Sequence, residues 1–188
     1  MRKLIVTEFV SLDGVMEAPG GEPGYQHSGW VMPFQSEGQM KYKLDETLEA
    51  GALLLGRVTY EGFSAAWPER DGPFADKMNA MPKYVVSATL KDPEWNNTTV
   101  LQGDLADEVA KLKEGDGGPV LVAGSRTLVH ALYDQGLVDE YRLMVFPVIL
   151  GSGRRVFPDD AADKTVLELT DTQAFSSGVT VQSYKPAS

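Results

Sequence analysis

Short apolar runs, each ended by a glycine or a polar turn, divide the chain into alternating strands and helices. In the clearest runs, 52–55 and 120–123, every residue is apolar. Such a run suits a strand that is buried on both faces, as in a parallel sheet. Further strands are expected over 3–10, 83–87, 98–101 and 140–149, and a C-terminal antiparallel pair over 165–175 and 179–184.

The helices are expected between these strands. Ser36 and Gln39 have the spacing of a capping box, and Met40, Leu44 and Leu48 then recur every four residues, which marks an apolar helix face. Other helices are expected to begin near 57, 104 and 125, with a further short candidate over 74–80. About eight strands and about four helices in this order predict an α/β fold with a mostly parallel sheet. We see no linker or repeat, so residues 1–188 are expected to form one domain.

Two strand–glycine–helix turns stand out, at Gly56 and at Gly124. Backbone N–H groups at a helix start lack partners within the helix, and the helix dipole adds positive charge there, so each turn suits a phosphate. Arg57 and Arg126 follow the two glycines and could add charged contacts. A pair of such turns suits the two ends of a dinucleotide. The alternative is that both glycines only allow close packing.

The loop over 17–33 is long, polar and rich in glycine and proline, but it also holds Tyr25 and Trp30. Long loops in compact domains are often lids, so we expect this loop to cover something. The alternative is an ordinary surface loop.

Composition narrows the function classes. A net charge of −10 and a pI near 4.6 argue against nucleic acid and against an anionic membrane surface as partners. The lack of cysteine excludes disulfides and thiolate nucleophiles, and two histidines do not suffice for a multi-histidine metal site, so no metal is expected. The start is too short in apolar residues for a signal peptide, and no run approaches the roughly 18 residues of a membrane span. We therefore expect a cytoplasmic protein.

The order of the motifs resembles the dihydrofolate reductase-like family, in the branch of the riboflavin-biosynthesis reductase that forms the C-terminal domain of a bifunctional deaminase–reductase. The stretches that match lie in the family's order along most of the chain, at 11–14, 55–61, 85–87, 122–125 and 146–153. The resemblance implies a three-layer dihydrofolate reductase-like fold with an antiparallel C-terminal edge. It also implies NADPH as cofactor and a homodimer.

The resemblance further implies which residues hold NADPH. The turn at Gly56 matches the site of the phosphates near the adenosine, the strand end at Ser87 that of the 2′-phosphate, and the turn at Gly124 that of the pyrophosphate. The implied cofactor-binding residues are Gly56, Arg57, Val58, Thr59, Ser87, Ala88, Thr89, Gly124, Ser125, Arg126, Thr127 and Leu128. The family often has Gly-Gly where this chain has Gly124-Ser125.

A second departure concerns the substrate. Dihydrofolate reductases carry an acid on the helix before the second strand, and the matching position here is Met40. Asp45 is offset on that helix and Glu37 lies before it, which favours a substrate other than dihydrofolate. Arg154 and Arg155 could hold a phosphoribosyl group, or could be a solvated turn.

By analogy to the fold, the nicotinamide lies where strand 3–10 ends. Asp13 and Glu8 are the acids placed there, and burial could raise either pKa, so they are the catalytic candidates. Asp13 could instead satisfy its own turn, and Glu8 could face solvent. The implied substrate-pocket residues are Thr7, Trp30, Gly151, Gly153 and Arg154.

The expected function is therefore NADPH-dependent hydride transfer to a small heteroaromatic or ribosylamino-pyrimidine-like substrate, related to riboflavin biosynthesis. Two alternatives stay open. One is a nucleotide-binding protein of the same fold without turnover, and the other is a pterin or dihydrofolate reductase.

Overall fold

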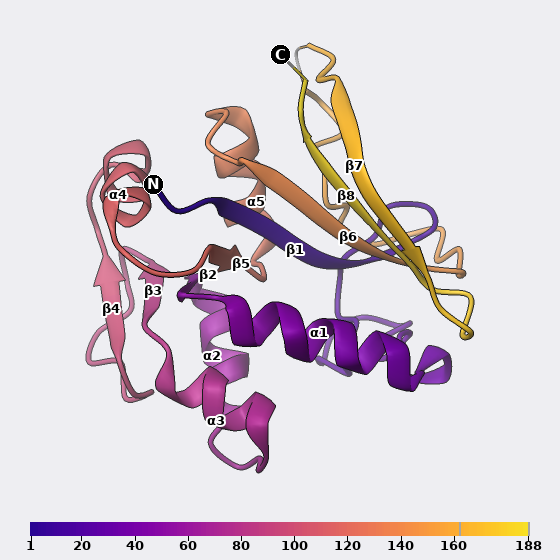
Figure 1. Ribbon diagram of the computed structural model, residues 1–188, viewed down its shortest axis with the longest axis horizontal. Helices are drawn as coiled ribbons and strands as arrows, with labels where there is room; N and C mark the ends of the chain where they lie inside the picture. The colour runs from indigo at the N-terminus through magenta and orange to yellow at the C-terminus, as the bar shows by residue number, and fades with distance from the viewer. Residues whose placement is uncertain (162, 188) are drawn as a thin grey trace.

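A mixed sheet of eight strands forms the centre of the computed structural model, which describes residues 1–161 and 163–187. The strands lie in the order β4-β3-β2-β5-β1-β6-β8-β7 (Figure 1). The six strands from β4 to β6 are parallel, and β8 is antiparallel to both β6 and β7. The strands span Leu4–Ser11 (β1), Ala52–Gly56 (β2), Lys83–Val86 (β3), Thr98–Leu101 (β4), Val120–Val122 (β5), Glu140–Phe146 (β6), Leu167–Ala174 (β7) and Thr180–Pro186 (β8). The predicted parallel sheet with an antiparallel C-terminal edge is confirmed.

The described residues form five α-helices, one more than the expected count. They span Glu37–Glu49 (α1), Arg57–Ala66 (α2), Pro73–Ala80 (α3), Leu105–Glu114 (α4) and Arg126–Asp134 (α5). The additional helix is α3, which forms at the short candidate over 74–80; it has only eight residues and starts with Pro73, a residue suited to the first helical position because the N–H it lacks would have no partner there. None of the helices in the described ranges is long and apolar enough to cross a membrane.

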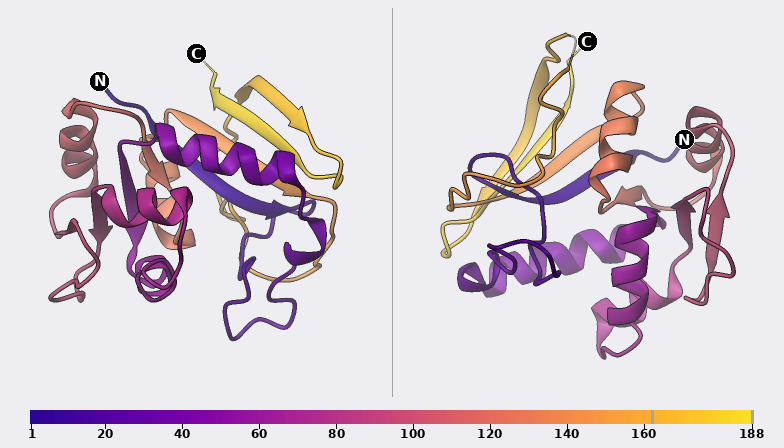
Figure 2. Two further views of the ribbon diagram at one scale, coloured as in Figure 1. Left: turned by 60° about the horizontal axis from the view of Figure 1, so that its bottom comes forward. Right: turned by 180° about the vertical axis from the view of Figure 1, so that it is seen from behind.

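Helices cover both faces of the sheet. Alternate residues of β1 face opposite layers: Leu4 and Val6 pack with α4 and α5 residues, whereas Ile5 packs with residues of α2 and α3. Figure 2 shows α1 and α2 on one side of the sheet and α5 on the other. The strand β2 is buried along its whole length, as its all-apolar sequence predicts.

Helix α1 forms where predicted, but its apolar face is not buried. Ser36 caps the helix by accepting a hydrogen bond from the Gln39 N–H, yet Met40 and Leu48 are 60% and 46% exposed. The repeat of Met40, Leu44 and Leu48 thus predicts the helix correctly but does not mark the face that packs on the sheet. The side chains that α1 buries include Glu46 and Thr47, because the strand surface that it covers is itself polar.

Candidate functional site

The two glycine turns lie against each other. Strands β2 and β5 are parallel neighbours, so the turns that follow them meet at the carboxyl edge of the sheet. The Gly56 N–H donates to the Gly124 carbonyl at 3.1 Å. A β-carbon on Gly56 would collide with the Ser125 side chain, and one on Gly124 would lie 2.7 Å from the Thr59 hydroxyl oxygen. Neither glycine can be replaced without moving the opposite turn.

The helices that leave these turns start without side-chain caps. Gly56 and Ser125 are the N-cap residues of α2 and α5; Gly56 has no side chain that could cap the helix, and the Ser125 side chain makes no cap hydrogen bond in the described part of the chain. By contrast, Ser36 and Asp104 cap α1 and α4 through their side chains. Two helix starts with open N–H groups and positive dipole ends are thus brought together, which is an arrangement suited to a pair of phosphates.

The two arginines beside the turns differ in their contacts. Arg57 forms an ion pair of 2.8 Å with Glu61 one helical turn later, and both side chains are about half exposed. Arg126 has a buried Nε that finds no hydrogen-bond partner within the described part of the chain. Arg57 can therefore exchange its partner for a phosphate, and Arg126 has a donor still to be satisfied.

The other predicted cofactor residues surround the turns. Val58 and Thr127 are exposed in the first turns of α2 and α5, and Leu128 is buried in the core. Ser87 follows β3, and its hydroxyl oxygen accepts hydrogen bonds from the backbone N–H groups of Thr89 and Leu90. Ser87 thus closes a tight turn that exposes Ala88 and Thr89 at the same edge of the sheet.

Glu8 is a buried acid beside the second turn. It lies on β1, the strand next to β5, and only 8% of its surface is exposed. Burial raises the pKa of Glu8 to about 8, although the charge of Lys43 and a hydrogen bond from the Gly124 backbone both lower it. Its Oε1 has no hydrogen-bond partner among the described residues. Glu8 therefore points inward, not toward solvent.

Asp13 has a different environment. It accepts hydrogen bonds from the Ser11 hydroxyl at 2.6 Å and from the N–H groups of Leu150 and Gly151 at 3.1 and 2.8 Å. Burial raises the pKa of Asp13, but these hydrogen bonds outweigh it and bring the pKa to about 2. The ionised carboxylate joins the turn after β1 to the loop after β6, so Asp13 is an anchor and holds no proton to donate at neutral pH.

The predicted substrate-pocket residues fall into two groups. Trp30, Gly151, Gly153 and Arg154 lie in the loops that follow β1 and β6. Trp30 is buried, packs edge-on against Phe146 with ring centroids 5.4 Å apart, and donates to the Glu17 carbonyl. Thr7 lies separately, in the middle of β1. The 17–33 loop thus covers the apolar end of β6.

Thr7 belongs to a buried polar network that was not predicted from the sequence. Its hydroxyl donates to the Glu46 carboxylate at 3.0 Å, and Lys43 bonds both groups. Arg142 on β6 lies 3.4 Å from Glu46 and 2.6 Å from Glu140, so the charges form a chain between α1 and the sheet. The one signal in the sequence was the Lys43–Glu46 spacing of three residues, which is common on exposed helices too.

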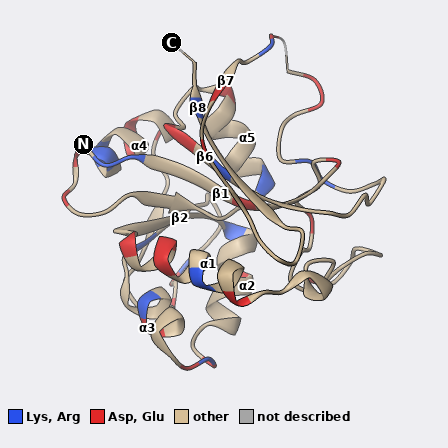
Figure 3. Cartoon of the chain, turned by 45° about the vertical axis from the view of Figure 1, so that its right-hand side comes forward, with Lys and Arg blue, Asp and Glu red and all other residues tan. Residues whose placement is uncertain are grey.

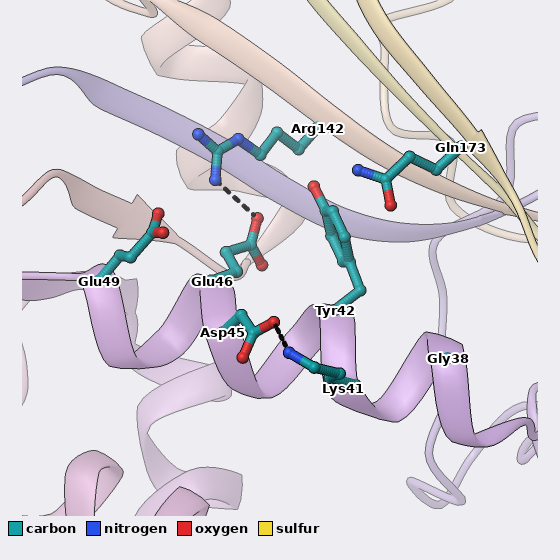
Figure 4. Close-up of a pocket in the computed structure, with 8 residues that line it drawn as sticks. All are labelled: Gly38, Lys41, Tyr42, Asp45, Glu46, Glu49, Arg142 and Gln173. Carbon is teal, nitrogen blue, oxygen red and sulfur yellow. Dashed lines mark hydrogen bonds and ion pairs between the residues drawn. The ribbon is translucent and has the colours of Figure 1, made fainter.

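A cavity of about 300 Å³ opens beside this network, between α1 and the strands β6 and β7 (Figure 4). Arg142 and Glu46 form an ion pair at its back, and Gln173 reaches it from β7. The lining residues are Gly38, Lys41, Tyr42, Asp45, Glu46, Glu49, Arg142 and Gln173. Figure 3 shows acidic and basic segments mixed along α1, so the cavity has no single sign of charge.

The family model of the RibD C-terminal domain matches residues 2–181. The chain belongs to this family. It is 29% identical over 183 residues to the uncharacterized protein YyaP of Bacillus subtilis strain 168, an alignment that covers 95% of this chain and 92% of YyaP.

Solved structures establish the fold class. A Shewanella sp. PV-4 protein assigned to riboflavin biosynthesis superimposes with a TM-score of 0.77 at 19% identity, over 99% of both chains. Dihydrofolate reductase from Enterococcus faecalis superimposes with a TM-score of 0.64 at 16% identity, over 99% of this chain and 97% of that one. The fold is therefore dihydrofolate reductase-like, as the sequence motifs predicted.

Proposed function

We propose that this RibD C-terminal-type domain is an NADPH-dependent reductase that transfers a hydride to a small heteroaromatic or ribosylamino-pyrimidine-like substrate. The observation that carries the proposal is the contact between the two uncapped helix starts at Gly56 and Ser125. Family membership supports a reductase, and the paired anion sites support a dinucleotide as the hydride source.

The residues at the carboxyl edge of the sheet fit the cofactor. The first turns of α2 and α5 offer N–H groups without side-chain caps, and the glycines allow a ligand to approach the backbone closely. The Nε of Arg126, which has no hydrogen-bond partner among the described residues, supplies a donor. Arg57 and the exposed turn at Ser87 would read the 2′-phosphate. When bound, NADPH supplies the hydride, and the protein orients the ring and excludes water.

The substrate would bind where β1 and β6 end, near the same edge. Arg154 is the arginine best placed to hold a phosphoribosyl group, since its side chain is mostly exposed and, among the described residues, pairs only with Glu17, at 3.7 Å. Arg155 is less available to a phosphate, because its side chain already donates to the Asp13 carbonyl and pairs with Asp159. A small-molecule substrate, and not a nucleic acid or a membrane, fits the net charge of −10.

One observation favours a pterin reductase as a second candidate. Helix α1 does carry a buried acid toward β1, namely Glu46, although the position matched to the family's acid in the sequence was Met40. Its carboxylate is already shared by Lys43, Arg142 and Thr7, which leaves less of it for a pterin ring. We therefore rank the pyrimidine substrate first.

The test is a titration of the purified protein with NADPH and NADH, followed by quenching of tryptophan fluorescence, and then a substrate panel. We expect saturable binding that favours NADPH, and NADPH oxidation with ribosylamino-pyrimidines in the panel. Oxidation only with dihydropterins would support the second candidate. Binding without oxidation by any member would support a nucleotide-binding protein without turnover, and no binding would contradict the proposal.

We also propose that the protein is a homodimer, as the family resemblance implies. The edge strand β7 is exposed along almost its whole length, and Leu169 on it is 52% exposed. Exposed edge strands readily pair with another chain. Light scattering should give twice the chain mass, and Leu169→Lys should lower it if β7 forms the interface.

A further inference from the structure

Glu8 lies directly behind the turn that would hold the pyrophosphate. Val6 of β1 pairs with Val122 of β5. Glu8 follows Val6 by two residues and Gly124 follows Val122 by two, so Glu8 and Gly124 lie at the same level along the two strands. Hydrogen bonding from the Gly124 backbone is among the influences that lower the pKa of Glu8, which puts the carboxyl group beside this turn. The carboxyl group is therefore buried beside the backbone of the turn itself.

The neighbours of Glu8 in the sheet are apolar. Leu143 is its neighbour on β6, and the residues two before and two after it on β1, Val6 and Val10, belong to the core. The charged group that acts on it from α1 is Lys43. From α5, Arg126 follows the turn by two residues. One oxygen of Glu8 is buried without a hydrogen-bond partner among residues 1–161 and 163–187, so the site holds the neutral acid better than the anion.

An ionised Glu8 would compete with a phosphate. The Glu8 carboxylate and the phosphate would both be stabilised by the same positive end of α5. Both would also lie beside the same backbone turn, where little water screens their repulsion. The neutral acid has no such effect. The two charges therefore oppose each other across the Gly124–Ser125 turn, and occupation of the turn depends on the charge state of Glu8.

We infer that Glu8 is a positioning residue that couples cofactor binding to a proton: the Gly124–Ser125 turn accepts the dinucleotide phosphate when the Glu8 carboxyl group is neutral and loses affinity when it is ionised. This inference rests on the proposed function. It adds to that function a defined pH limit, set by a residue beside the turn that would hold the pyrophosphate.

The size of the effect follows from the titration of Glu8. With a pKa of about 8, its neutral fraction falls about tenfold between roughly pH 7 and pH 9. The Kd for NADPH should therefore rise about tenfold over this range if binding requires the neutral form. The phosphates of NADPH keep the same charge over this range, so they do not contribute to the change.

The experiment is calorimetric titration with NADPH at these two pH values, each in two buffers of different ionisation enthalpy. We expect weaker binding at the higher pH and net proton uptake there. The variant Glu8→Gln keeps the shape of the side chain without the titration and should show the same Kd at both pH values. The control Glu114→Gln removes an exposed acid at the end of α4 and should behave as the original protein.

The outcomes separate the two proposals. A Kd that is equal at both pH values in the original protein, with no proton uptake, overturns the role of Glu8 while leaving NADPH binding established. A folded Glu8→Gln variant that keeps the tenfold change also overturns it. No NADPH binding at either pH overturns the proposed function and this inference together. The proton uptake of the original protein decides the matter even if Glu8→Gln does not fold.

Discussion

Gly56 and Ser125 lie in contact, although 69 positions separate them in the chain, and a β-carbon on Gly56 would overlap the Ser125 hydroxyl. The contact joins the turns of two neighbouring strands into one surface. It also fixes the distance between the starts of α2 and α5, on which a dinucleotide site at this edge depends.

This contact predicts that Gly56→Ala separates the two turns. The variant should lose NADPH affinity by roughly tenfold or more and be destabilised by about 1–3 kcal/mol, since backbone and side-chain atoms of Ser125 would have to move. Thermal unfolding and NADPH titration measure the two effects. The control is Gly62→Ala in the same helix, where a β-carbon meets open space and should stabilise by about 0.5–1 kcal/mol. Unchanged NADPH affinity in Gly56→Ala would show that the turns do not form the site.

Arg57 should distinguish NADPH from NADH. Arg57→Ala removes a guanidinium from the start of α2 and is expected to weaken NADPH roughly tenfold more than NADH, as the loss of a charge-assisted bond to a phosphate requires. Fluorescence titration with both dinucleotides gives the ratio. Glu61→Gln is the matched variant, because it releases Arg57 from its ion pair and should leave NADPH binding equal or tighter. Equal losses for both dinucleotides in Arg57→Ala would mean that Arg57 does not read the 2′-phosphate.

Glu8 should make the protein less stable as pH rises. Burial raises its pKa from 4.5 to about 8, so between these values the folded chain binds a proton that the unfolded chain has released. The free energy of unfolding therefore falls with rising pH in this window, by up to about 1.4 kcal/mol per pH unit. The stability that Glu8 contributes is fully present only below the unfolded-state pKa. Glu8→Gln should lack this fall and exceed the original protein in stability near pH 8.

Urea unfolding of both proteins at about pH 5 and about pH 8 measures this difference. The difference in unfolding free energy between Glu8→Gln and the original protein should be small at the lower pH and largest at the higher one. Parallel stability curves would show that Glu8 titrates with an ordinary pKa, and hence that it is not buried as the structure has it.

The network around Glu46 should be essential for stability. Its side chain is only 1% exposed and is held by Lys43 and Arg142, so Glu46→Gln leaves two cations without their shared anion. The expected loss is about 3–5 kcal/mol of unfolding free energy, the usual cost of breaking a buried pair. Chemical denaturation measures it. Asp45→Asn, next along the helix, affects an exposed pair with Lys41 and should cost less than about 1 kcal/mol.

Local sequence patterns were enough to predict the sheet and the two turns. The run Leu53–Leu55 has no polar position, so it could only be buried on both faces, and a glycine followed by a helix start at Gly56 and Gly124 gives the same local geometry in any parallel sheet. The helix α3 was expected only as a short candidate, since its eight residues give too few turns to show a clear periodic pattern.

The orientation of α1 could not be predicted in this way. Met40 and Leu48 form an apolar repeat, yet they face outward, because the side of the helix that meets the sheet is selected by Thr7 and Arg142 on strands far along the chain. A helix pattern assigns residues to faces, but the partner surface decides which face is buried.

The sequence by itself therefore determined the order of strands and helices, the glycine turns and the family motifs, since each depends on neighbouring residues and on local backbone preferences. Only the tertiary structure decided that β5 lies between β2 and β1. That strand order brings Gly56 against Ser125 and places Glu8 behind Gly124. These contacts join segments distant in the chain, and the burial and charge state of such residues follow from packing, which no local pattern contains.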